Sequence, residues 1–287
     1  MKTILKLIVL PLYLLNTLEK GLSDWNIIRV AFGKGKNNHE IINGTVLRVH
    51  YPKGSYSPSK LPVGGIGFYS NPDEINMATE VLLKYQVKFD KTFDPVLGGK
   101  LPGLFINTGA NTTGGSGGKH TDNASCRIAW RANFSAEAYL YLPTFNTDVV
   151  RRQGTFNTDV VRRQGTFNTT SNQTQSQEYN SLVIKNGEYG DSLWRNKLRF
   201  DPDNWNDVSI QLRLNNVKDN IPIQDGLLQV TINNITQKFD KIIWRTDTKH
   251  FINTIIFETF FGGSSPKTAT PHDTWTYFQN VQVQKIN

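Results

Sequence analysis

The chain has 287 residues, of which 38% are hydrophobic, and this is enough for one sizeable core in a single large domain. Its formal net charge of +8 fits an anionic partner, such as a nucleic acid, an acidic membrane or an acidic polysaccharide, and equally fits surface charge that serves solubility alone. The basic residues are dispersed and no recognised motif interleaves them, which argues against nucleic acid. The only cysteine is Cys126, so an intrachain disulfide is excluded.

The first twenty residues resemble a secretory signal peptide. Their apolar stretch is broken by Lys6 and Pro11 and is too short to span a bilayer. We therefore expect residues 1–20 to be a signal peptide, residues 21–287 to form one secreted domain, and the protein to have no stable membrane insertion; the alternative is a buried first helix. Asn-x-Ser/Thr sequons support a secreted glycoprotein, and they begin at Asn43, Asn111, Asn123, Asn133, Asn168, Asn172 and Asn234.

Short runs of alternating apolar and polar residues, bounded by Gly, Asn, Asp and Pro, recur along the chain. This pattern predicts β-strands. The clearest runs lie at 45–52, 79–89, 181–186, 207–216, 226–234, 253–263 and 276–286. With one further hairpin they make about eight or more strands. The sequence therefore predicts an all-β jelly roll, a sandwich of two antiparallel sheets with a concave substrate cleft.

The further hairpin lies in SCRIAWRANFSAEAYLYLP, residues 125–143, and has one polar face. In its first strand, Cys126 alternates with polar residues and is expected to face the core as a small hydrophobe. The opposite face of the hairpin carries Ser125, Arg127, Ala129, Arg131, Tyr139 and Tyr141. A turn near 133–136 would place Arg127 opposite Tyr141 and Ala129 opposite Tyr139. The sequence thus predicts cations beside phenols on one surface.

Such a face suits a chain of sugar acids. Cleaving a polyuronate by β-elimination requires removal of the C5 proton next to a carboxylate, so a cation or hydrogen-bond donor must first neutralise that carboxylate. A base then takes the C5 proton and an acid protonates the departing O4. Tyrosine can serve as either, but it can act as the base only where nearby cations lower its pKa. This chemistry needs no metal and no cofactor.

Residues 144–154, TFNTDVVRRQG, are repeated without change at 155–165. An eleven-residue duplication is too short for a solenoid repeat. We interpret 143–178 as a long surface loop that the duplication has extended, since surface loops accept insertions at low cost. Its four arginines could contact an anionic polymer, but a solvated insertion without function is favoured.

Several blocks together resemble polysaccharide lyase family 14, which contains alginate and glucuronan lyases, and the similar family 20 of glucuronan lyases. In order along the chain, these blocks are FDPVLGGKLPGLF (93–105), SCRIAWR, the Tyr-x-Tyr of AYLYLP, DGLLQVTIN and FETFFGG. The resemblance runs from about residue 47 to the C-terminal TYFQNVQV. It implies a β-jelly roll, in agreement with the strand pattern.

The resemblance also implies roles for individual residues. Lys100 matches the family's essential lysine, and Tyr139 and Tyr141 match its paired tyrosines, the candidates for base and acid; a tyrosine is favoured as the base, with Lys100 second. The substrate-binding candidates are His120, Ser125, Arg127 and Arg131, with Ser125 and Arg127 matching the family's Ser-x-Arg pair.

Each of these residues also has an ordinary structural interpretation. Lys100 could be a solvated turn lysine, the arginines could pair with Asp or Glu on the sheet, the tyrosines could pack on it, and His120 could be a loop histidine. A glycan on Asn123 would obstruct the site, so either Asn123 is unmodified or the assignment of Ser125 is wrong.

We therefore predict a secreted, monomeric polysaccharide lyase whose partner is an acidic polysaccharide. The CRIAWR block favours β-1,4-glucuronan as substrate, with alginate second. The alternative is a non-catalytic jelly roll that binds an acidic polysaccharide without cleaving it.

Overall fold

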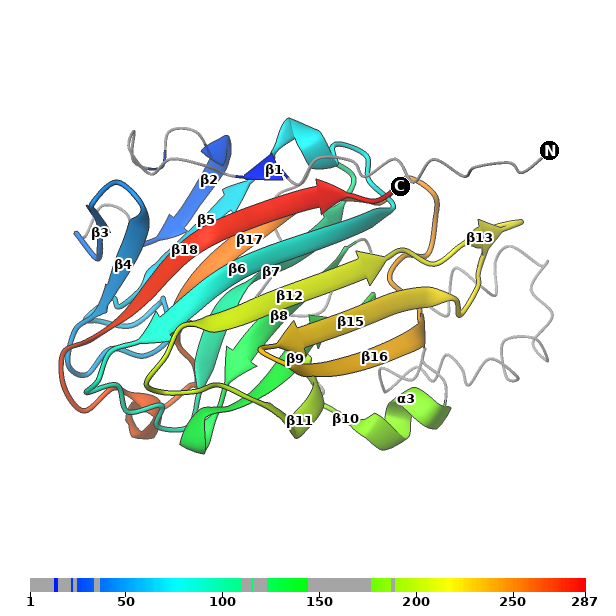
Figure 1. Ribbon diagram of the computed structural model, residues 1–287. Helices are drawn as coiled ribbons and strands as arrows, with labels where there is room; N and C mark the ends of the chain where they lie inside the picture. Colours follow the sequence, from blue (N-terminus) through cyan, green and yellow to red (C-terminus); the bar gives the residue numbers. More distant parts are fainter. Residues whose placement is uncertain are drawn as a thin grey trace, which may run out of the picture.

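The computed structural model describes residues 13–14, 22, 25–33, 37–109, 115, 123–143, 177–186 and 189–287. Its main body is two antiparallel sheets (Figure 1). The first sheet has the strand order β16 (Ile235–Ile242), β15 (Gly226–Ile232), β12 (Asn206–Arg213), β6 (Glu80–Phe89), β18 (Thr274–Lys285), β4 (Val46–Tyr51) and β3 (His39–Ile42), with β1 (Tyr13–Leu14) also paired to β18. The second has the order β10 (Val183–Ile184), β11 (Asp191–Arg199), β9 (Ser135–Tyr141), β8 (Ala124–Trp130), β7 (Gly99–Asn107), β17 (Phe251–Phe261), β5 (Ile66–Ser70) and β2 (Ile27–Phe32).

The remaining elements are short. They are the strand pair β13 (Val217–Lys218) and β14 (Ile221–Pro222), the helix α3 (Gln177–Leu182) and the 3₁₀ turns η4 (Asp73–Ile75), η5 (Ala132–Phe134) and η6 (Pro266–Thr268). The described residues contain no helix long and apolar enough to cross a membrane. The predicted all-β jelly roll of two antiparallel sheets is confirmed.

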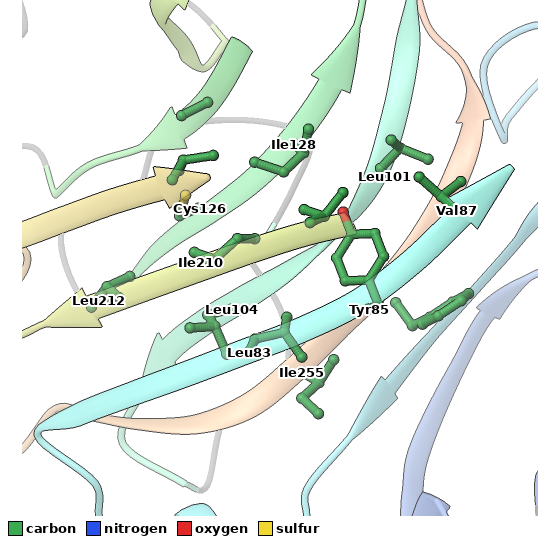
Figure 2. Close-up of a cluster of buried hydrophobic side chains, with 14 of the residues drawn as sticks. Leu83, Tyr85, Val87, Leu101, Leu104, Cys126, Ile128, Ile210, Leu212 and Ile255 are labelled. Atoms are coloured by element: carbon green, nitrogen blue, oxygen red, sulfur yellow. The ribbon is translucent and has the colours of Figure 1, made fainter. Parts of the chain in front are cut away.

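The hydrophobic core lies between the two sheets. Figure 2 shows side chains from both layers meeting there: Leu83, Tyr85 and Val87 of β6, Ile210 and Leu212 of β12, Leu101 and Leu104 of β7, Cys126 and Ile128 of β8, and Ile255 of β17. Cys126 is fully buried in this layer, as its position in the alternation predicts. Because the inner face of the second sheet is committed to this core, its polar residues must lie on the outer face.

The register of the β8–β9 hairpin differs from the predicted one by two residues. Arg127 pairs with Tyr139, not Tyr141, and Ala129 pairs with Glu137, not Tyr139. The turn is centred earlier than expected because Asn133 and Phe134 both adopt left-handed backbone angles, with φ of 56° and 57°. A shift of two residues preserves the alternation, so every side chain keeps its predicted face.

The run at 181–186 is only partly a strand. Residues 181 and 182 belong to α3, and β10 has two residues. The Ser181 hydroxyl donates to the carbonyl of Glu178, and Lys241 of β16 pairs with the Glu178 side chain at 2.8 Å. These contacts hold this segment as a helix end. The predicted signal peptide lies outside the described residues except for the two of β1, and the duplicated segment lies wholly outside them.

Candidate active site

The outer face of the second sheet carries a compact polar cluster on β7, β8 and β9. Strand pairing places its side chains in rows: Lys100 is opposite Ala129, which is opposite Glu137, and the next rows pair Arg127 with Tyr139 and Ser125 with Tyr141. Arg131, just after β8, reaches the same group by binding Glu137. The structure thus brings together all the predicted site residues except His120, which lies outside the described residues.

Lys100 contacts Tyr139, and Tyr139 contacts Tyr141. The Lys100 Nζ lies 3.6 Å from the centre of the Tyr139 ring. The rings of Tyr139 and Tyr141 meet edge to face, with centroids 5.7 Å apart, over the small side chain of Ala129. Ala129 therefore leaves the space that a larger residue would take from the amine and the phenols.

The Tyr139 hydroxyl accepts a hydrogen bond from the backbone N–H of Gly190, at 3.2 Å. A Cβ at Gly190 would lie 2.5 Å from the Tyr139 ring, so only glycine allows this approach. The loop before β11 thereby fixes the position of the phenol.

Arg127 pairs with an acidic residue, which is one of the ordinary interpretations of the arginines, but the pair is buried. Its guanidinium bonds the carboxylate of Glu258 on β17, and the two side chains are 1% and 4% exposed. Between them, Gly103 on β7 brings its backbone so close to β8 that a Cβ would lie 1.9 Å from the Cys126 carbonyl oxygen. The Arg127 guanidinium lies 5.6 Å from the centre of the Tyr141 ring. Arg127 therefore supplies positive charge from within the sheet. Its guanidinium is not exposed to bind a substrate carboxylate directly.

Ser125 is also already occupied. Its hydroxyl donates to the carbonyl of Gly115 at 2.7 Å, and the residue is fully buried. The Ser-x-Arg pair is thus part of the site's internal framework in this structure. Asn123, two residues earlier, is only 5% exposed, which leaves no space for a glycan and removes that objection to Ser125.

Glu137 is the second acidic residue of the site. It is fully buried and accepts from Arg131 Nε at 2.8 Å, Ser192 Oγ at 2.8 Å and Arg195 Nε at 2.6 Å. Its parity with Tyr139 and Tyr141 could have identified it in the sequence, because it lies two residues before Tyr139. Glu258 and Arg195 could not be found in that way, since no local pattern relates β17 or β11 to β8.

The surroundings shift the pKa values of Lys100 and Tyr139 in opposite directions. Burial, and then the positive charges of Arg131 and Arg127, lower the pKa of Lys100 well below its ordinary value. Burial, and then Tyr141, raise the pKa of Tyr139. Lys100 therefore loses its proton more readily than an ordinary lysine, whereas Tyr139 retains its proton and can donate it in a hydrogen bond.

Glu137 is held ionised. Burial opposes its charge, but the hydrogen bonds and charges of Arg131 and Arg195 outweigh burial and lower its pKa. Within the described ranges, no group of three or more His, Cys, Asp or Glu side chains is arranged to hold a metal ion. The cluster as it stands offers an amine that deprotonates easily, the protonated phenol of Tyr139, the neighbouring hydroxyl of Tyr141 and surrounding positive charge.

Comparisons with known proteins agree with this description. Polysaccharide lyase 14 is the family whose sequence profile matches, over residues 39–178 and 162–281. The alginate lyase of this family from Aplysia kurodai has a similar structure, with a TM-score of 0.71 and 27% identity over 92% of both chains. Alginate lyase vAL-1 from Chlorella virus has a TM-score of 0.70 and 24% identity, and the match covers 95% of this chain and all of that one.

A curated relative is the protein named Exolysin from Paramecium bursaria Chlorella virus 1. It is 25% identical over 221 residues, which are 73% of this chain. The match spans only 30% of the length of Exolysin. The family profile, by contrast, extends over most of this chain, and the chain therefore belongs to polysaccharide lyase family 14.

Proposed function

We propose that this polysaccharide lyase cleaves an acidic polyuronate by β-elimination, with Lys100 as the base and Tyr141 as the acid. The observation that carries the proposal is the contact of Lys100, a lysine of lowered pKa, with Tyr139, whose ring in turn contacts Tyr141 on one buried, positively charged face. The alginate lyase from Aplysia kurodai, in the same family, supports the substrate class.

Each step uses a group of this cluster. The neutral amine of Lys100 takes the C5 proton of a uronate residue, and the C5–H electron pair becomes the C4–C5 double bond. The C4–O4 bond breaks, and O4 takes a proton from the Tyr141 hydroxyl. The products are one chain with an unsaturated uronate at its non-reducing end and one with a new reducing end, whose C1 hydroxyl carries the former glycosidic oxygen.

Charge develops on the carboxylate beside C5 as the proton leaves. The Tyr139 hydroxyl keeps its proton and can donate to that carboxylate, and Arg127 contributes a fixed positive charge below it. Groups that are held in place before the reaction stabilise such charge without reorganisation. Lys100 is preferred over Tyr139 as the base because their pKa values move in opposite directions.

The choice of polymer is the finer part of the proposal. The similarity to the Aplysia kurodai enzyme makes alginate the first substrate to test, ahead of the glucuronan that the CRIAWR block favours. The purified protein should be incubated with polymannuronate, polyguluronate and polyglucuronate while the ultraviolet absorbance of the new double bond is followed. We expect absorbance to rise with at least one polymer.

The same experiment tests the competing function. A binding module without turnover would retard in a gel containing polyuronate, yet release no unsaturated ends. A flat absorbance trace with all three polymers would therefore refute the lyase and favour the binding module. Secretion is part of the proposal, supported by the pattern of residues 1–20, and N-terminal sequencing of the exported protein would test it.

A further inference from the structure

Strand β11 breaks its own alternation beside the polar cluster. Ser192 pairs with Tyr139 and so lies on the outer face, which in a regular strand would put residue 194 on that face and residue 195 in the core. The structure shows the reverse. Trp194 is packed in the core at 4% exposure, and Arg195 contacts Glu137 on the outer face.

A β-bulge of four residues causes this inversion. Leu193 pairs with Ala138 and Leu198 pairs with Ala136, so the residues from 194 to 197 all lie opposite position 137. Trp194 and Asn196 both have a φ of 65°. A bulky residue in this left-handed region is strained, and such strain gathers where a chain re-aims a side chain for function. Here its result is to bring the Arg195 guanidinium into the cluster.

The resulting group carries more positive than negative charge. Glu137 is a single carboxylate bound by two guanidiniums, those of Arg131 and Arg195, so the three side chains carry a net charge of +1. Lys100, Arg127, Tyr139 and Ser192 are the other groups around it, and none of these is an acid that is ionised at neutral pH.

Arg131 and Arg195 are more exposed to solvent than the other charged residues of the cluster. Arg127 is 1% exposed and Lys100 is 8% exposed, whereas the side chains of Arg131 and Arg195 are 24% and 33% exposed. Arg131 donates to Glu137 from Nε and Nη2, whereas Arg195 donates to Glu137 from Nε and to Ser192 Oγ from Nη2, at 2.9 Å. A guanidinium has five N–H donors, so each arginine has further donors for a ligand. An anion that reaches Lys100 from solvent therefore meets these two arginines.

We propose that Arg195 and Arg131, oriented by Glu137, form a second carboxylate site that binds the uronate residue adjacent to the one being cleaved. This inference rests on the proposed function, because it assigns part of the same polymer to the site. Every unit of a polyuronate carries a carboxylate, so a chain with one unit at Lys100 presents another anion nearby. Guanidiniums suit it, since they bind carboxylates with two parallel hydrogen bonds.

The test compares Arg195→Gln and Arg195→Lys with the wild type in steady-state cleavage. Arg195→Gln should raise KM for the polymer about ten-fold or more and leave kcat within about two-fold, because a charged hydrogen-bond pair is lost in binding. Arg195→Lys keeps the charge but loses the planar fork, so its KM should lie between the two. Arg199→Gln, at an exposed arginine on the same strand, is the matched control and should leave both constants unchanged.

An unchanged KM in Arg195→Gln would overturn the proposal. If kcat falls at that unchanged KM, Arg195 is instead a positioning residue for Lys100. If Arg195→Gln lacks a cooperative thermal transition, Arg195→Lys decides by the same criteria. Gel retardation by polyuronate separates this inference from the proposed function. Should the wild type bind polymer without cleaving it, weaker retardation of the Arg195 variants would still support the site, and equal retardation would refute it.

Discussion

The outer faces of the two sheets differ although both sheets are antiparallel and share one core. On the first sheet, β4 and β12 alternate between buried and accessible residues, as expected for strands with one solvent-exposed face. On the second sheet, every residue of β7, β8 and β9 is buried. Charged residues are rarely fully buried unless they are paired. The charged residues on this buried face therefore require an explanation, whereas those on the solvent-exposed face of the first sheet do not.

The ion pairs on the two faces show the same contrast. Arg48 and Glu40 on the first sheet pair at 2.6 Å, with side chains 32% and 56% exposed. Arg127 and Glu258 on the second sheet are almost completely buried. A buried pair adds little net stability over an apolar pair of the same shape, yet it is costly to break. The second sheet therefore keeps charge in its interior for what that charge does to Lys100 and the tyrosines.

The largest expected effect is on catalysis at Lys100. Lys100→Met should lower kcat/KM for the polyuronate about 10³-fold, since it removes the base while filling a similar volume. Lys84→Met, at an exposed lysine of β6 on the first sheet, is the control and should retain wild-type activity. The absorbance assay measures both. Substantial activity in Lys100→Met would show that another group takes the proton.

Tyr141→Phe removes only one hydroxyl. It should lower kcat about 10²-fold, because O4 loses its proton donor, and leave the melting temperature close to that of the wild type. Tyr277→Phe on the first sheet removes a hydroxyl that donates to Asp90 and should leave kcat unchanged. Normal turnover in Tyr141→Phe would exclude this phenol from the mechanism.

The contributions of the Arg127–Glu258 and Arg48–Glu40 ion pairs to the stability of the protein can be compared directly. Glu258→Gln leaves Arg127 charged and buried, so it should lower the free energy of unfolding by about 3–5 kcal/mol. Glu40→Gln, at the exposed pair, should cost about 0.2–1 kcal/mol. Urea denaturation of both variants measures the difference. Equal losses would mean that burial does not distinguish the two faces.

The smallest expected effect is on how the stability of the fold changes at acid pH. The pKa of Glu137 is lower in the folded protein than the ordinary 4.5, so its stabilising contribution is complete above that value and is lost as the pH falls through the folded pKa. Unfolding by urea at a series of pH values below about 5 should therefore show a smaller loss of stability in Glu137→Gln than in the wild type. Parallel curves for the two proteins would contradict this linkage.

Much of the site was accessible from the sequence. Alternation correctly placed Ser125, Arg127, Tyr139 and Tyr141 on one face and Cys126 on the other, because side-chain direction in a strand depends only on parity. The same parity places Glu137 on the polar face, two residues before Tyr139. The hairpin register was wrong by two residues, since the turn geometry at Asn133 and Phe134 does not follow from parity.

The sequence by itself determined the class of fold, the core-facing residues of β8 and the polar character of its outer face, because these follow from local periodicity. Only the tertiary structure decided which charges meet. Glu258 lies 131 residues from Arg127, and the pairing of β17 with β7 brings it within reach. Arg195 faces Glu137 only because a bulge reverses the alternation of β11, and a period-two pattern cannot reveal its own interruption.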